Sequence, residues 1–421
     1  MIRRFCLYGF LKNQRYFEPF LILAFLEKGL DFFAIGLLVG FREIATVVLE
    51  IPSGAVADVF GRRRSMIISF VFYILSFTVF AVAGSVVPLM GAMLFFALGD
   101  SFRTGTHKAM IFQWLQLEGR LDERTQVYGY TRSFSKLGSA LSSLIAGVLV
   151  FLSGNFVAVF WLSIIPYALN LVNFLGYPAA LEGEARREAN LGEAFRLTGR
   201  ALRQTTTRAG LRALILESML LEGTFKVTKD YLQPILKALA LGLSLPLVGG
   251  LLRDGRLDGD QRTAIVIGLV FFVYFLLMGA ASRRAHRFCQ WAGGEERMTR
   301  LAWGANLLAF AVMGAGLYLG LAWPAVVAFL VLGMIQNTFR PAQIARIDGQ
   351  SESVMGATIL SIESQSKSLA GAVLAPLLGW LVDAERAADP AQVQAFCPVA
   401  AVGVITALVA LFFRRGRKAA A

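Results

Sequence analysis

The sequence has little charge and few residues of the kinds that carry catalysis or bind metals. Only 16% of its 421 residues are Asp, Glu, Lys or Arg, against roughly 25% in average soluble domains. It contains two histidines and three cysteines, and Cys6, Cys289 and Cys397 lie far apart without a CxxC pair. It also lacks a Walker-type GxxxxGK[ST] segment and a Ser/His/Asp set. We therefore expect that the protein is not an enzyme and that it binds neither a metal ion nor a cofactor.

Long apolar runs take the place of the missing charge. Hydrophobic residues make up 56% of the chain, and its mean hydropathy is +0.62. A helix needs about 20 apolar residues to cross the hydrocarbon core, whereas a transmembrane barrel shows short alternating strands. The runs are long and do not alternate, so they predict an all-α integral membrane protein. Twelve spans are expected near residues 5–27, 33–57, 65–84, 86–109, 127–152, 155–177, 211–240, 263–282, 299–319, 322–345, 354–382 and 394–413.

The positive charge of the chain is explained by membrane topology. The net charge is +13, but Lys and Arg cluster at the ends of apolar runs and form no basic domain with interleaved aromatics. No nucleic-acid partner is therefore expected. With the N-terminus inside, the inner loops and tails hold 24 Lys and Arg residues against 5 in the outer loops. The positive-inside rule thus predicts an inner (cytoplasmic) membrane protein with both termini in the cytoplasm and an even number of spans.

The longest polar stretch, residues 182–212, separates spans six and seven. Leu191, Phe195 and Leu202 are spaced along one helical face, with arginines around them. This pattern predicts an amphipathic helix that lies on the inner leaflet. The alternative is a solvated linker whose arginines only set the topology.

The two halves of the sequence repeat one another. Span one contains Tyr-x-Glu-Pro-x-Leu at residues 16–21, and span seven contains Tyr-x-Gln-Pro-x-Leu at residues 231–236. A Phe-Arg pair recurs at 102–103 and 339–340. Matches in the same order indicate a parallel duplication of six spans, as several transporter folds have. The expected organisation is an N-terminal six-helix bundle (1–180), a cytoplasmic linker with an amphipathic helix (181–210) and a C-terminal six-helix bundle (211–421).

The loop after span two carries a recognisable motif. It reads Gly-Ala-Val-Ala-Asp-Val-Phe-Gly-Arg-Arg over residues 54–63 and resembles the GxxxDxxGRR signature of the major facilitator superfamily (MFS). The resemblance implies twelve transmembrane helices in two pseudo-symmetric bundles and a secondary transporter that works by alternating access. In that family the motif governs switching between inward-open and outward-open states. By resemblance, this switch consists here of Gly54, Asp58, Gly61, Arg62 and Arg63.

The residues of the motif also suit this role chemically. Gly61 allows a tight turn, and Asp58 can accept hydrogen bonds from Arg62 or from a helix N-terminus. The alternative is that the arginines only anchor the inner interface. The corresponding loop of the second half has Arg283 at the Asp position, which predicts a one-sided latch.

Charged residues interrupt several spans. A charge at the bilayer centre costs at least about 2.5–3.5 kcal/mol on insertion scales, so retained charges are functional candidates. Here they share helical faces at spacings of three and four, in spans that the resemblance places around a central cavity. The alternative is that they form ion pairs holding helices together. The candidates for substrate binding or coupling are Asn13, Arg15, Glu18, Asp100, Arg103, Arg132, Lys136, Glu222, Lys226, Lys229, Asp230, Gln233, Asn337, Arg340, Glu363 and Lys367.

These interrupting charges include more Lys and Arg than Asp and Glu, which favours a small anionic or zwitterionic substrate. A buried carboxylate can take up and release a proton as its surroundings change. Glu18, Asp100, Glu222 and Asp230 are candidates for that role, so protons are the expected coupling ion. We expect a monomer in the lipid bilayer.

The direction of transport is weakly indicated. Drug:proton antiporters of the superfamily usually carry GxxxGPxxGG in helix five, but span five has Gly138 and Gly147 with no proline between. Arg103 and Gly105 in span four loosely resemble that group's helix-four motif, which gives a slight preference for efflux. The alternatives are a uniporter, a lipid or lysolipid translocator, or a non-transporting membrane sensor on the same fold.

Overall fold

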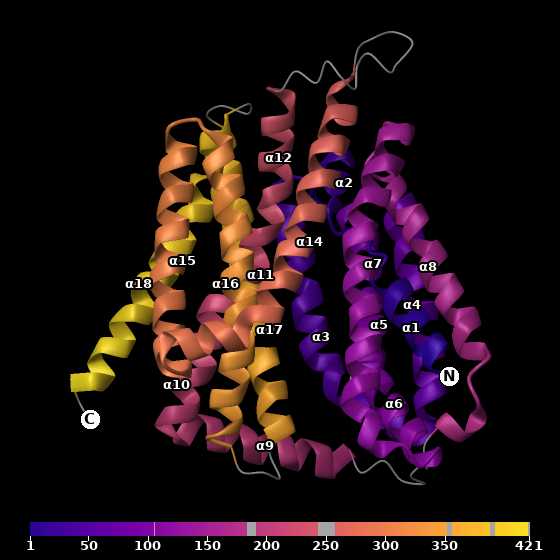
Figure 1. Ribbon diagram of the computed structural model, residues 1–421. Coiled ribbons are helices and arrows are strands. Elements are labelled where there is room, and N and C mark those ends of the chain that lie inside the picture. The colour runs from indigo at the N-terminus through magenta and orange to yellow at the C-terminus, as the bar shows by residue number, and fades with distance from the viewer. Residues whose placement is uncertain (105, 183–190, 243–256, 352–355, 388–391, 420–421) are drawn as a thin grey trace. The chain divides into compact units, whose positions relative to one another are not determined.

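Helices account for the regular structure of the chain. A computed structural model describes residues 1–421 except 105, 183–190, 243–256, 352–355, 388–391 and 420–421 (Figure 1). The described residues form helices and turns and contain no β-strand. In chain order the helices are α1 (Ile2–Lys12), α2 (Leu21–Glu27), α3 (Phe32–Phe60), α4 (Arg62–Val82), α5 (Val86–Arg103), α6 (Thr106–Leu117), α7 (Arg124–Ser153), α8 (Ala158–Leu175), α9 (Leu191–Thr207), α10 (Ala209–Ser218), α11 (Thr224–Thr228), α12 (Leu232–Leu241), α14 (Gly259–Ala292), α15 (Glu295–Tyr318), α16 (Ala322–Asp348), α17 (Gly356–Arg386) and α18 (Cys397–Ala419).

Ten helical stretches within the described residues are long and apolar enough to cross a membrane. They correspond to predicted spans two to six and eight to twelve. Exposed apolar side chains follow one face of α8 through Trp161, Ile165, Leu169 and Val172, as expected of a helix that faces lipid. The prediction of an all-α, multi-pass membrane protein is confirmed.

Span one is interrupted, and span seven changes helix type along its length. Helix α1 ends at Lys12, and a series of turns leads to α2 at Leu21. Span seven stays helical and passes from α10 through a π-helix (Met219–Gly223), α11 and a 3-10 turn (Lys229–Tyr231) into α12. Both irregular stretches include or adjoin the repeated Tyr-x-[Glu/Gln]-Pro motif, where proline cannot donate to a helix.

The chain divides into two units by its internal contacts. The first consists of Met1–Leu30 and Phe41–Phe195, and the second of Asp31–Gly40 and Arg196–Ala421. Helix α3 is therefore shared, because its first residues belong to the second unit. The expected organisation into six-helix bundles of residues 1–180 and 211–421 stays a prediction.

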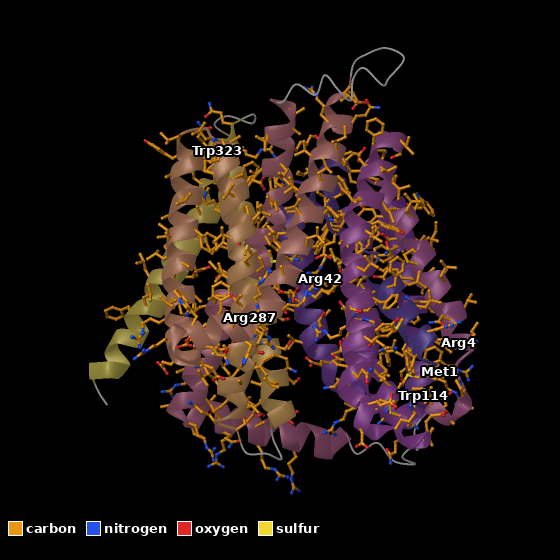
Figure 2. All side chains as sticks on the ribbon, in the orientation of Figure 1. Met1, Arg4, Arg42, Trp114, Arg287 and Trp323 are labelled. Atoms are coloured by element: carbon orange, nitrogen blue, oxygen red, sulfur yellow. The ribbon has the colours of Figure 1, made fainter. Side chains whose placement is uncertain are left out.

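The first unit is built on contacts of α4 with α5 and α8, and of α1 with α7 and α8. Its interior is rich in buried phenylalanine, including Phe70, Phe77 and Phe160. Hydrophobic burial does not drive helices together in lipid, so close packing of such rings supplies much of the cohesion. At the N-terminal end, where Figure 2 labels Met1, Arg4 and Trp114, the rings of Phe5 and Trp114 meet edge to face at 5.8 Å.

Two residues at the end of α2 tie three helices of the first unit together. The carboxylate of Glu27 accepts hydrogen bonds from the backbone amides of Phe156 (2.7 Å) and Val157 (3.1 Å), where α8 begins. The ammonium of Lys28 donates to the carbonyls of Ala81 and Ala83 at the end of α4. The acid thus lies at a helix N-terminus and the base at a C-terminus, as the helix dipoles favour.

In the second unit, α15 packs on α16 and α18, and α14 packs on α12 and α16. The first residues of α3 lie against α17 at backbone contact distance. A methyl group added to Gly36 would lie 2.4 Å from the carbonyl oxygen of Ala375, and Gly379 is similarly close to Phe32. The carboxylate of Asp383 accepts hydrogen bonds from the amides of Phe32 (3.1 Å) and Phe33 (2.7 Å), which caps α3.

Helix α9 is found within the polar stretch that was predicted to contain one. Ala201 is fully buried against Leu211 and Ile347 of the second unit, while Leu202 is 52% exposed on the other side. The side chains of Leu191 and Phe195 lie outside the described part of the structure. Contact with the inner leaflet stays a prediction.

Candidate functional site: a basic cavity and a charge cluster

A cavity of about 430 Å³ lies within the first unit, between α1, α5, α6 and α7. This volume falls within the range of roughly 300–1,000 Å³ that is typical of small-molecule pockets. The six lining residues of α7 follow one helical face. The cavity is lined by Phe5, Tyr8, Gly9, Lys12, Asn13, Arg103, His107, Lys108, Tyr128, Thr131, Arg132, Ser135, Lys136 and Ser139.

Close packing of α1 on α7 forms one wall of this cavity. A methyl group at Gly138 would lie 2.6 Å from the carbonyl oxygen of Phe10, and one at Gly9 would lie 2.7 Å from the hydroxyl of Ser135. The buried amide of Gln14 donates to the carbonyl of Gly138 at 3.2 Å. The absence of a side chain at these glycines therefore fixes the approach of the two helices.

The charged residues described in the cavity lining are all basic. Five lining residues are Lys or Arg, and none of the described lining residues is acidic. Lys12 is the last residue of α1, and Arg132 and Lys136 lie one turn apart on α7. Each cation in a membrane interior costs about 2.5–3.5 kcal/mol or more without compensation, so these positive charges are candidates for a functional role.

Arg103 has a carboxylate partner. Its guanidinium donates to Asp100 at 2.6 Å and to the hydroxyl of Tyr73 at 3.0 Å. Tyr73 in turn donates to Asp100 at 2.5 Å. Asp100 therefore orients Arg103 toward the cavity and does not itself line it.

Aromatic rings flank the cations. His107 lies against Tyr8 with ring centroids 3.8 Å apart, and it meets Phe5 edge to face. The ammonium of Lys108 and the guanidinium of Arg132 lie 5.6 and 5.9 Å from the ring centre of Tyr128. These cation–π contacts hold two positive charges near one aromatic ring.

Hydroxyl groups on α7 bond to their own helix. Thr131 donates to the carbonyl of Tyr128, and Ser135 donates to that of Thr131. Ser139 is within reach of both the carbonyl of Ser135 (3.2 Å) and the side-chain oxygen of Asn13 (3.3 Å). These hydroxyl groups thus already donate hydrogen bonds within the protein.

Four charged residues of the second unit form a closed cluster. Arg340 on α16 contacts Glu222 at 3.2 Å and also donates to Glu363. Lys367 lies 3.1 Å from both carboxylates. Each acid therefore contacts both bases, and we call these four residues the charge ring. Glu363 is fully buried.

The π-helix in span seven positions the charge ring. Glu222 lies in the π-helix Met219–Gly223, a local widening that is frequent at functional sites. A methyl group at Gly223 would lie 2.9 Å from Ala370, so α17 approaches closely at this point. Lys226, one turn on, donates to the hydroxyl of Ser368 at 3.2 Å.

The structure brings together many of the candidates predicted from the sequence. Asn13, Arg103, Arg132 and Lys136 line the cavity, and Glu222, Arg340, Glu363 and Lys367 form the charge ring. The others lie elsewhere: Arg15 pairs with Glu18 at 3.7 Å, Lys229 lies 3.8 Å from Asp230, Gln233 is fully buried, and Asn337 donates to the carbonyl of Gly333.

Several lining residues were not among the candidates. Lys12 and Lys108 line the cavity but do not belong to the predicted set. Tyr128, Thr131 and Ser139 carry a signal in the sequence, because each lies four residues from Arg132 or Ser135 on the same helical face. Arg42, labelled in Figure 2, pairs with the neighbouring Glu43 at 2.9 Å.

The motif after span two is held within the first unit. Gly61 has a φ of +92°, and a side chain there would meet Glu182, which confirms that glycine is needed for this turn. Arg62 donates to Gln113, and Arg63 donates to the carbonyls of Phe174 and Leu175 at the end of α8. Gly54 and Asp58 belong to α3, but their side chains lie outside the described part of the structure.

Residues of the kinds that bind metal ions are not grouped in the described part of the chain. Among the described residues, no cluster of three or more His, Cys, Asp or Glu side chains is placed to hold a metal ion. The cavity instead offers cations and aromatic rings, which suit an organic anion.

A family profile and a curated relative both point to the same protein family. The sequence profile of the Major Facilitator Superfamily matches residues 13–362. A protein of Bacillus subtilis (strain 168), the uncharacterized MFS-type transporter YxaM, is 39% identical over 90 residues. That match spans 21% of this chain and about a quarter (23%) of the relative's length.

Solved structures resemble the chain over nearly its full length. The crystal structure of the nucleoside transporter NupG superimposes with a TM-score of 0.72 at 14% identity, covering 98% of this chain and 96% of that one. The peptide transporter POT in complex with sulfate gives 0.69 at 15% identity, covering 98% and 94%. At such low identity these likenesses show the fold alone.

Proposed function

The chain belongs to the Major Facilitator Superfamily, and from this premise we propose that it carries a small organic anion or zwitterion across the membrane by alternating access. The observation that carries the proposal is the first-unit cavity with its five basic residues and no acidic residue among those described. A solute that brings negative charge compensates cations that the membrane interior otherwise leaves unsolvated.

Protons are the proposed coupling ion, and the charge ring is their proposed site. Its two acids and two bases contact one another at about 3 Å. A proton on Glu222 or Glu363 removes one negative charge and weakens both contacts to the bases. The charge ring can therefore adopt two states whose net charge differs by one unit, as coupling to a proton requires. Asp100, held by Arg103 and Tyr73, is the corresponding candidate in the first unit.

The conformational switch is proposed to include Gly54, Asp58, Gly61, Arg62 and Arg63. In support, Arg63 binds carbonyls at the end of α8, and Glu182 lies within 4 Å of Arg63 and Arg64. Hydrogen bonds of this kind are individually modest, so they can bias an equilibrium between two states without locking it.

The remaining features of the proposal follow from the sequence. The protein is proposed to act as a monomer in the inner membrane with both termini in the cytoplasm, since Lys and Arg are concentrated in the expected inner loops. Efflux is slightly favoured over uptake on the helix-four motif around Arg103.

Two experiments test the proposal. In the first, purified full-length protein is heated with benzoate, tyrosine or benzylammonium as anionic, zwitterionic and cationic probes, since a ligand of the folded state raises its unfolding temperature. Stabilisation by the first two is expected. Stabilisation by benzylammonium alone would refute an anion carrier.

The second experiment measures flux of the bound probe in liposomes. We expect the flux of the unaltered protein to collapse when the proton gradient is removed. In Glu222→Gln and Glu363→Gln, we expect the flux no longer to respond to the gradient. The exposed pair Arg120 and Glu123 lies outside both sites, so Glu123→Gln is the control. Flux that ignores every ion gradient would indicate a uniporter or a lipid translocator, and no flux at all would indicate a sensor.

A further inference from the structure

The charged residues of the first unit separate into those with carboxylate partners and those without. Arg15 pairs with Glu18, Arg42 pairs with Glu43, and Arg103 pairs with Asp100. All of these pairs join residues no more than three positions apart in the sequence. Each is therefore compensated locally, whatever ligand is bound.

Three cations that line the cavity have no carboxylate in ion-pair contact. Within the described part of the chain, Lys12, Lys108 and Arg132 have no Asp or Glu within 4 Å, and all three line the cavity. Lys136 also lines the cavity. Positive charge therefore reaches the cavity from several helices.

A singly charged ligand does not compensate such a lining. Lys12 lies at the end of α1, Lys108 on α6, and Arg132 on α7, so the cations approach the cavity from three helices. One carboxylate forms close contacts with one or two of them and leaves the others exposed to a medium of low dielectric constant. A ligand with separated or multiple anionic oxygens can contact all three.

We propose that the solute taken by this cavity carries at least two negative charges at neutral pH, as a phosphate ester or a polycarboxylate does. The inference rests on the proposed function, because it concerns the same cavity, and it narrows the substrate class. The rings of Tyr8 and Tyr128 provide an apolar surface for the body of the solute, while Lys12, Lys108 and Arg132 bind its anionic groups.

The test compares ligands that share one ring and differ in charge. Binding of benzoate, phthalate, benzene-1,3,5-tricarboxylate and phenyl phosphate to the full-length protein is measured at constant ionic strength, because salt screens such contacts. Phthalate, the tricarboxylate or phenyl phosphate is expected to bind at least about tenfold more tightly than benzoate, a difference of about 1.4 kcal/mol. Binding of phenyl phosphate alone points to phosphate esters, and binding of the polycarboxylates alone points to polycarboxylates. Both results support the inference.

Variants separate a binding role from a structural one. Arg132→Gln is expected to lower the ratio of dianion to benzoate affinity, whereas Arg132→Lys keeps the charge and keeps the ratio. Arg120→Gln, an exposed arginine of the loop between α6 and α7, removes the same charge away from the cavity and leaves the ratio unchanged. A mere folding defect would lower stability without moving the ratio.

Two results would overturn the idea in distinguishable ways. Equal affinities for benzoate and the multiply charged ligands would refute the inference and leave an anion carrier in place. Binding of benzylammonium and of no anion would refute the proposed function as well.

Discussion

Replacing Glu363 by glutamine tests the charge ring most directly. Glu363 is fully buried and contacts both Arg340 and Lys367, whose side chains are 29% and 12% exposed. The substitution leaves two cations facing the single carboxylate of Glu222. Breaking a buried ion pair typically costs about 3–5 kcal/mol, and the partial exposure of Arg340 places the expected loss near the lower end, at about 3 kcal/mol.

Thermal unfolding of the purified protein in detergent measures this loss. For units of 150–250 residues, each kcal/mol corresponds to about 2–4 °C, so the midpoint should fall by about 6–12 °C. The matched control is the double variant Glu363→Gln/Lys367→Gln, which keeps the Arg340–Glu222 contact of 3.2 Å and restores the balance of charge. It should lose clearly less than the single variant. If both variants unfold at the same temperature, the four residues do not act as a charge-balanced set.

Three further substitutions probe single contacts. Glu27→Gln weakens the bonds that begin α8 and should cost about 1 kcal/mol, seen as a lower midpoint of unfolding than in Glu118→Gln on the surface. Arg63→Gln removes the donors at the C-terminus of α8 and should slow transport more than Arg63→Lys, which keeps the charge. Trp303→Ala, which empties a fully buried site, should cost about 3–5 kcal/mol, whereas Trp291→Ala at a 78% exposed site should cost less than about 0.5 kcal/mol.

Much of the fold follows from the sequence because hydropathy is a local property. Ten of the twelve predicted spans fall within helical stretches that are long and apolar enough to cross a membrane, since an apolar run of sufficient length has few alternatives in a bilayer. The interruption of span one and the changes of helix type in span seven were not predicted. The repeated proline at 19 and 234 was visible, but the consequence of a proline depends on which neighbouring groups satisfy the freed carbonyls. In span one, turns such as Glu18 N to Arg15 O do so.

The site could be predicted only along single helices. Spacing placed Arg132 and Lys136 on one face of α7, and the structure places both at the cavity. Residue spacing along one helix does not predict contacts between helices. Glu222 and Lys367, for example, are in contact although they are 145 positions apart in the sequence. Which cations lack a carboxylate partner is a property of three-dimensional packing. The sequence alone therefore showed an excess of positive charge without showing where it is concentrated.

Gly36 and Gly91 give a matched pair of glycines for testing the packing of α3 on α17. A methyl group at Gly36 would lie 2.4 Å from the carbonyl oxygen of Ala375 and 2.7 Å from the α-carbon of Pro376, both backbone atoms that cannot rotate away. Gly91 lies inside α5 with nothing within 4 Å of the added atom. Gly36→Ala should therefore destabilise the protein by about 1–3 kcal/mol through overpacking, whereas Gly91→Ala should be neutral or stabilise by up to about 1 kcal/mol. The measurement is the midpoint of thermal unfolding of each variant. If Gly36→Ala is as stable as Gly91→Ala, α3 and α17 are not held at backbone contact.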